Sequence, residues 1–280
     1  PPFDAQARRA LYQARQEPTV LHNNCSAKHI GLLATARHLG LDPEGYTRPD
    51  HGVQVAIRSL LAFLAGLEAE EIELASDGCA VPAFCLPLRS FAFAVARLAA
   101  AGEGVREIPP EDVALEEELY DEPDPEAGLE LPEEPAAGGA ADEPEDGLPV
   151  PLDAALARVW QAMRDHPVLV AGSRGRLDTD LMRQAAAHGV PLVAKSGAEG
   201  VYAIGLVHDG RAFGIALKIE DGAERARNSA ALETLAQLGF LPEAAIEALS
   251  GYHQPVILNR RDEPVGEVNP VFRLNRGLPA

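Results

Sequence analysis

The sequence predicts an α+β protein with a mainly antiparallel sheet that is flanked by helices. Helical patterns dominate up to residue 103, and three strand-like segments follow one another between residues 190 and 220. Short turns join these strands, so the alternation of strands and helices that is typical of a parallel sheet is missing. The chain has 280 residues, 46% of them hydrophobic, which is enough to bury one sizeable core. We expect residues 1–280 to form a single domain.

The first part of the chain predicts helices from the spacing of its apolar residues. Four segments share this pattern: residues 4–15, 26–40, 51–67 and 89–102. In the third segment the apolar face carries Val53, Ile57, Leu60, Leu61 and Leu64. Residues 76–88 are punctuated by Gly and Pro and predict a loop, and Cys85 in this loop is expected to be a core residue.

Most of the net charge of −19 lies in one segment. Residues 101–150 contain eighteen acidic residues, one Arg and eight Pro, whereas the other 230 residues sum to only −2. A segment with so few apolar side chains cannot offset its chain entropy by burial, which predicts a disordered or loosely attached insertion at about 103–149. It is either an electrostatic tether for a partner or a solvated loop. We expect no nucleic-acid partner.

The second part of the chain mixes both patterns. Residues 168–172 predict a short strand, and residues 178–189 predict a helix with an Asp or Thr cap. The main strands are expected at residues 190–197, 200–207 and 211–220. Further helices are expected at residues 152–167, 226–241 and 243–251, and a final hairpin at 255–270.

Cysteine content and hydropathy indicate the compartment. Three cysteines are too few for a disulfide scaffold, and an odd number would leave one thiol unpaired, so a reducing cytoplasm is expected. No uncharged apolar run reaches 18 residues, which predicts neither a membrane span nor a signal peptide. The chain opens with Pro and enters a helical pattern almost at once, so we expect sequence upstream of it.

The stretch "HNNCSAKHIG" at residues 22–31 gathers reactive side chains at the start of a predicted helix. Cys25 and Lys28 are three residues apart and face the same side of a helix, whose N-terminus favours a thiolate. Cys79 in "DGC" could add a second sulfur, and three protein ligands with one open position are typical of a catalytic zinc site. A neutral lysine at pH 7 costs about 4.6 kcal/mol. Zinc binding, at about 10 kcal/mol or more, exceeds this cost. The alternative is that both cysteines are ordinary buried residues.

A second candidate feature is "VPLVAKSG", in which Lys195 ends an apolar strand. Lys-Ser-Gly at this place is typical of the edge strand of serine acyl hydrolases of the β-lactamase type. The chain has only three lysines, Lys28, Lys195 and Lys218, which favours a functional role for Lys195. The alternative is a surface lysine in a hairpin. The companion motif Ser-x-x-Lys does not occur in the 280 residues.

Several stretches together resemble the bacterial Rhizobium-type, or thermolabile, L-asparaginases. They are "LYQARQEPTVLHNNCSAKHIGLL", "GYTRPDHGVQ", "SDGCAVPAFCLPLRSFAFAVARL", "AKSGAEGVYAIGL", "GIALKIEDG" and "PVGEVNP". The resemblance covers nearly the whole chain outside the acidic segment. It implies a serine β-lactamase-like fold, a homodimer, and hydrolysis of L-asparagine to L-aspartate and ammonia.

The resemblance also implies roles for individual residues. Zinc would be held by Cys25, Lys28 and Cys79, the three residues that spacing had also suggested. Lys195 matches the lysine that activates a serine, whereas His29 and Asp77 match positions near the substrate and a zinc-bound water.

The chain departs from the family in two respects. Ala27 stands where the family usually has glycine. The nucleophilic Ser-x-x-Lys of the family, and the second serine that pairs with the lysine matching Lys195, are expected upstream of His22. Three interpretations therefore remain open. The chain is an asparaginase whose nucleophile lies upstream; it is an inactive zinc-binding or dimerising relative or fragment; or it is a thiol enzyme that uses Cys25 with His29 as its base.

Overall fold

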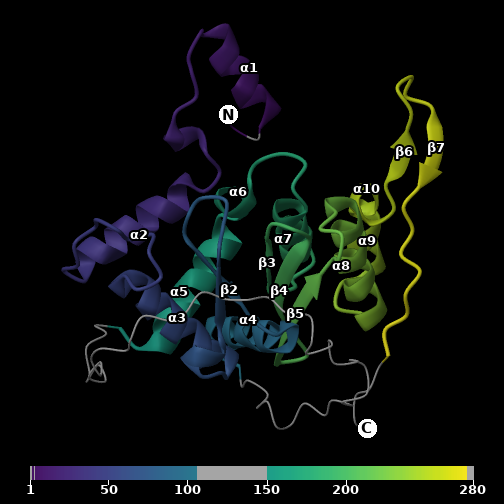
Figure 1. The fold of residues 1–280 in the computed structure, drawn as a ribbon. Coiled ribbons are helices and arrows are strands. Elements are labelled where there is room, and N and C mark those ends of the chain that lie inside the picture. The colour runs from purple at the N-terminus through teal and green to yellow at the C-terminus, as the bar shows by residue number, and fades with distance from the viewer. Residues whose placement is uncertain (1, 3, 106–149, 276–280) are drawn as a thin grey trace, which may run out of the picture. The chain divides into compact units, whose positions relative to one another are not determined.

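The computed structural model describes residues 2, 4–105 and 150–275. Within them, the expected α+β composition is confirmed, because helices occur with three small sheets whose strand pairs are all antiparallel (Figure 1). The chain divides into two compact units, unit 1 (Pro1–Ala94) and unit 2 (Val95–Ala280). A single domain over residues 1–280 stays a prediction. The insertion expected at about 103–149 lies outside the described residues, except for residues 103–105.

Unit 1 contains the predicted helices and one hairpin. Asp4 caps the first helix by accepting a hydrogen bond from the Ala7 amide at 2.7 Å. The elements in chain order are α1 (Ala5–Gln13), the 3-10 turn η1 (Val20–His22), α2 (Ser26–His38), α3 (Gly52–Ala65), the 3-10 turn η2 (Ala69–Glu71), β1 (Glu73–Ser76) and β2 (Pro82–Cys85). Of the predicted apolar face of α3, Val53 and Leu64 are buried, whereas Leu60 is exposed.

The hairpin β1–β2 replaces the loop that Gly and Pro had predicted at residues 76–88. Its strands pair from Glu73 with Cys85 to Ser76 with Pro82. A turn of five residues that begins with Asp-Gly closes it, which is why the segment looked irregular in the sequence. The prediction that Cys85 is a core residue is wrong, because this thiol is exposed at the end of β2.

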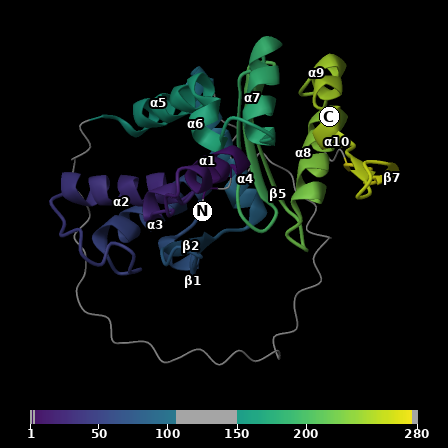
Figure 2. The same cartoon turned by 90° about the horizontal axis from the view of Figure 1, so that it is seen from above.

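Helix α4 (Leu88–Glu103) crosses the boundary between the units. The remaining elements of unit 2 begin with α5 (Leu152–Asp165), α6 (Pro167–Ala171), α7 (Leu177–Ala187), β3 (Leu192–Ser196), β4 (Val201–His208) and β5 (Arg211–Lys218). They end with α8 (Glu224–Leu238), α9 (Glu243–Ala248), α10 (Ser250–His253), β6 (Val256–Leu258) and β7 (Pro264–Glu267). Helices α8, α9 and α10 form one group next to β5 (Figure 2).

The strand predicted at residues 168–172 is wrong, because these residues fall mostly in helix α6. Pro167 occupies the first turn of this helix, where its fixed φ favours helix and its missing N–H costs nothing. The Asp or Thr cap predicted for α7 is also wrong. The N-cap is Arg176, so Asp178 and Thr179 lie inside the first turn.

The three-stranded sheet β3–β4–β5 organises unit 2, with β4 in the centre. Lys195 is opposite Ala203, and Ser196 is opposite Tyr202. Directly opposite residues share a face and neighbours alternate, so Lys195 and Ser196 lie on opposite faces of the sheet. Lys195 is exposed and Ser196 is 6% exposed.

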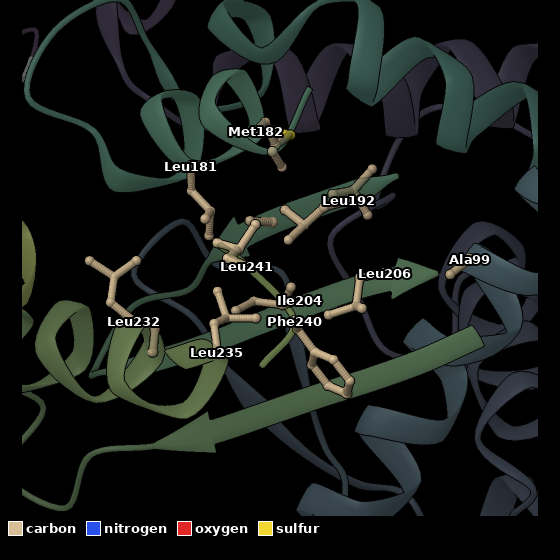
Figure 3. Packing of buried hydrophobic residues seen from close by; sticks show 14 of the residues in the cluster. Ala99, Leu181, Met182, Leu192, Ile204, Leu206, Leu232, Leu235, Phe240 and Leu241 are labelled. Atoms are coloured by element: carbon tan, nitrogen blue, oxygen red, sulfur yellow. The ribbon is translucent and has the colours of Figure 1, made fainter. Parts of the chain in front are cut away.

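The hydrophobic core of unit 2 forms where helices cover this sheet. Leu181 and Met182 of α7 and Leu232 and Leu235 of α8 meet side chains of β3 and β4 (Figure 3). The cluster also includes Leu192, Ile204, Leu206, Phe240 and Leu241. This core fixes the strand that carries Lys195.

Trp160 fills a narrow space between helices and sheet and is fully buried. Gly102 of α4 leaves room for it, because a methyl group at Gly102 would overlap the indole side chain. Gly205 of β4 is also close, since a Cβ there would lie 3.3 Å from Cζ3 of Trp160. The indole N–H donates to Glu103 at 2.7 Å, and Glu103 also binds Arg164. Two glycines are therefore required for one aromatic side chain.

Candidate functional site

Unit 1 brings together Cys25, Lys28, Asp77 and Cys79, which we call the thiol–amine cluster. The Cys79 thiol forms a hydrogen bond with Cys25, and the Lys28 ammonium pairs with Asp77. The charges of Cys25 and Cys79 also act on Lys28. The three residues that the sequence proposed as zinc ligands therefore lie close together, although Lys28 and Cys79 are far apart in the sequence.

The start of α2 positions the first two members of the cluster. Cys25 is the N-cap residue, and its amide donates to the Asn23 side chain at 2.8 Å. Ser26 is therefore the first residue of the helix. Lys28 follows in the first turn of α2 on the same side as Cys25, as the spacing of three residues predicts.

The turn between β1 and β2 positions the other two members. The Asp77 carboxylate accepts hydrogen bonds from the amides of Cys79 at 2.7 Å and Val81 at 3.1 Å. Ala80 has a φ of 64°, which closes the turn in the left-handed region. Asp77 therefore has two functions, because one carboxylate oxygen shapes the turn that presents Cys79 and the other pairs with Lys28.

The cluster surrounds one ammonium with acidic groups. Burial lowers the pKa of Lys28, but the hydrogen bond to Asp77 and the charges of Cys25, Asp77 and Cys79 outweigh it, so the pKa is raised. The hydrogen bond to Cys25, burial and the neighbouring negative charges raise the pKa of the Cys79 thiol. For Asp77, burial opposes the shift, but hydrogen bonds from Lys28 and two amides lower its pKa. Lys28 is therefore protonated, and its ammonium is the positive charge among these acidic groups.

The donor set fits zinc by its chemistry, because thiolate sulfur is a soft ligand that this metal prefers. Among the described residues, no group of three or more His, Cys, Asp and Glu side chains is arranged to hold a metal ion. A zinc site here would therefore use the Lys28 amine as its third donor beside Cys25 and Cys79. Loading would require Lys28 to lose its proton and to leave Asp77, so metal binding and proton release would be linked.

His29 lies in the same helix but is directed elsewhere. Its Nδ1 is 2.7 Å from the Tyr46 hydroxyl, and the two rings meet edge to face with centroids 5.7 Å apart. Tyr46 is itself held through its carbonyl, which accepts a hydrogen bond from Gln54 at 2.8 Å. This pairing orients the imidazole toward Tyr46, whereas the Cys25 thiol pairs with Cys79. The thiol-enzyme alternative gains no support from this arrangement.

In unit 2, Lys195 occupies the end of β3 as the sequence predicted. Its ammonium donates to the carbonyl of Ser196, the next residue. Lys218 ends β5, the other outer strand of the sheet, in the same way and donates to the Ile219 carbonyl at 2.6 Å. Because β3 and β5 both run antiparallel to β4, the two lysines lie at the same end of the sheet.

Two buried charged residues beside this strand end were not foreseen. Asp178 of α7 is 1% exposed and accepts a hydrogen bond from the Ser196 amide, and Arg227 of α8 is 6% exposed and donates to the Gly197 carbonyl at 3.4 Å. We call this pair the β3 support. In the sequence, Asp178 resembled a helix cap, and a bond to a backbone amide leaves no sequence pattern.

Comparison with protein families identifies the class as that of amide-hydrolysing enzymes. Residues 1–119 and 136–270 match the sequence model of L-asparaginase II, so the chain belongs to the L-asparaginase II family. The unmatched residues 120–135 fall inside the acidic segment. Comparison with curated proteins gave no match. Among the described residues, no helix is long and apolar enough to span a bilayer.

Proposed function

We propose that the protein hydrolyses L-asparagine to L-aspartate and ammonia. The family match over most of the chain carries this proposal. The thiol–amine cluster and the strand-end Lys195 support it, because the family resemblance implies both features for such an enzyme. We further propose the Rhizobium-type subfamily with its β-lactamase-like fold, a homodimer, and a cytoplasmic location.

In the proposed mechanism the nucleophilic serine belongs to a Ser-x-x-Lys motif upstream of His22, and Lys195, which pairs with a second upstream serine, supplies the base. The neutral amine of Lys195 takes the hydroxyl proton while the serine oxygen attacks the side-chain amide carbon of asparagine. The carbon–nitrogen bond then breaks, and the leaving nitrogen takes the proton from Lys195 and departs as ammonia. Water hydrolyses the resulting ester, which releases aspartate and restores the serine hydroxyl.

Cys25, Lys28 and Cys79 are the residues that we propose to hold zinc, with Asp77 and His29 close to the substrate. When bound, the metal would supply a positive charge that orients a water molecule or the substrate carboxylate. Asp77 contributes independently of the metal, because its hydrogen bonds fix the turn that presents Cys79.

Removal of the Lys195 amine tests this function. In the full-length protein, Lys195→Ala is expected to lower ammonia release from asparagine at least 100-fold, on the order of the contribution of a general base. Lys218→Ala is the matched control, because Lys218 ends the other outer strand of the same sheet and makes the equivalent bond to the next carbonyl. Equal activity of the two variants would contradict the assignment of Lys195.

The second candidate is a zinc-binding or dimerising relative without catalysis. The observation that favours it is that no serine in the 280 residues precedes a lysine by three positions. Stoichiometric zinc in a full-length protein that releases no ammonia from asparagine would support this candidate over the first.

A further inference from the structure

Asp178 is a buried carboxylate that the proposed mechanism does not use. It lies in the first turn of α7 and is 1% exposed. A buried charge is costly unless hydrogen bonds and opposite charges compensate it. The Ser196 amide donates to it, and the N-terminus of α7 favours a negative charge at this position.

The position of Ser196 gives this hydrogen bond its significance. Ser196 lies between Lys195 and Gly197 and is the last residue of β3, an edge strand of the three-stranded sheet. An edge strand presents backbone groups that no neighbouring strand satisfies. Asp178 accepts the hydrogen bond of the Ser196 amide, so a side chain of α7 holds β3 at its last pair with β4.

Arg227 holds the next residue from the other flanking helix. Its guanidinium donates to the Gly197 carbonyl at 3.4 Å and lies over the ring of Tyr202, 5.6 Å from the centroid. Glu224 and Asn228 fix the guanidinium through hydrogen bonds of 2.8 Å and 3.0 Å. Tyr202 of β4 is the strand partner of Ser196, so Arg227 contacts both the residue that follows β3 and the neighbouring strand β4.

The same charges surround the buried hydroxyl of Tyr202. Burial raises the pKa of Tyr202 well above its usual value, Asp178 raises it further, and Arg227 and Arg176 act in the opposite direction. Asp178 of α7 and Arg227 of α8 therefore both act on Tyr202, which shares the face of Ser196 opposite to Lys195.

We propose that Asp178 and Arg227 are positioning residues that hold the end of β3 and thereby fix Lys195 for amide hydrolysis. This inference rests on the proposed function for its catalytic part. Asp178 binds the Ser196 amide and Arg227 binds the Gly197 carbonyl. Two successive residues are therefore held, which fixes the position and the direction of the backbone at the end of β3. Loss of either bond would let the Lys195 backbone shift while its side chain stays intact.

The test compares three variants of the full-length protein. Asp178→Ala is expected to lower kcat on the order of 10- to 100-fold with little change in KM, because a small displacement of a catalytic group has effects of this size. Asp178→Asn retains an oxygen acceptor for the Ser196 amide and is expected to recover most of this loss. Asp180→Asn is the matched control, because Asp180 lies in the same helical turn but binds the Tyr252 hydroxyl at 2.6 Å.

A second readout does not depend on turnover. In Asp178→Ala the Ser196 amide is expected to exchange its hydrogen about tenfold faster or more, because it loses its buried acceptor. The Leu206 amide of β4, opposite Leu192 at the other end of β3, serves as an internal reference. Arg227→Lys is the second variant, to be used if Asp178→Ala fails to fold. It retains the charge but not the planar fork of the guanidinium, and faster exchange of the Ser196 amide is expected in it as well.

Several results would overturn the proposal. Unchanged Ser196 exchange in both Asp178→Ala and Arg227→Lys would do so whether or not the wild type is active. An equal loss of kcat in Asp180→Asn would mean that the loss in Asp178→Ala reflects general destabilisation of α7 and not the bond to Ser196. A wild type that releases no ammonia but shows the expected exchange would instead contradict the proposed function and support the positioning of the strand.

Discussion

In unit 1 the side chains of Lys28 and Asp77 keep 40% and 27% of their surface exposed, whereas in unit 2 Asp178 and Arg227 are only 1% and 6% exposed. Water can solvate the members of the thiol–amine cluster when they separate, so their pairing can be exchanged for another cation at modest cost. The β3 support has no such alternative, because each of its charges would be left buried and unpaired. One region is therefore suited to binding, and the other to holding a strand still.

The strongest test of the rigid region is Gly102→Ala. The new methyl group would overlap Trp160, so we expect the free energy of unfolding of unit 2 to fall by about 3 kcal/mol or more. Chemical denaturation followed by Trp160 fluorescence measures it.

Gly251→Ala is the control for this substitution. A Cβ at Gly251 meets no atom within 4 Å, so a change within about 1 kcal/mol is expected. Equal effects of the two substitutions would show that the space around Trp160 is not tightly packed.

Loss of one sulfur is the corresponding test of the exchangeable region. Cys79→Ala is expected to weaken zinc binding at least about 100-fold, because a direct ligand matters more than the outer contacts that cost 10- to 100-fold. Cys85→Ala, which removes an exposed thiol of β2, should leave zinc content unchanged. Metal analysis of both purified variants gives the answer, and zinc retained in Cys79→Ala would exclude Cys79 as a ligand.

A smaller effect is expected from acid at the pair of Glu233 and His253, whose side chains are 19% and 12% exposed and 2.8 Å apart. Burial alone would raise the pKa of Glu233, but hydrogen bonds from Gln237 and His253 and the charge of His253 outweigh it and lower the pKa. The stabilisation is therefore complete above the unfolded pKa of 4.5 and is lost as the pH falls through the lower folded value.

Glu233→Gln should remove this part of the acid sensitivity. Urea denaturation between about pH 6 and about pH 3.5 should show a smaller decrease of the free energy of unfolding in the variant than in the wild type. Parallel curves would mean that the pair does not titrate with folding.

The secondary structure was predictable where periodicity was long and failed where it was short. Strands β3 to β5 and helices α2, α3 and α8 follow from their patterns, since each extends over several repeats. The apolar run at residues 168–172 is too short for periodicity to distinguish a strand from the helix that Pro167 begins. The hairpin β1–β2 was missed because its turn dominates its composition.

The candidate site was predictable to the extent that it depends on sequence spacing. Cys25 and Lys28 meet because a helix places residues three apart on one side, and Cys79 follows a carboxylate that shapes its own turn. The β3 support depends on tertiary packing between α7, α8 and the end of β3. No local pattern records such an arrangement, so only the fold brings it to notice.

The distribution of two residue types makes the two regions separately observable. The single Trp of the chain is Trp160 in unit 2, and all three cysteines belong to unit 1. Indole emission therefore reports on one unit, while thiol alkylation reports on the other, in the same sample and without any label. If alkylation accelerates before emission shifts during gradual denaturation, unit 1 opens while unit 2 is still folded.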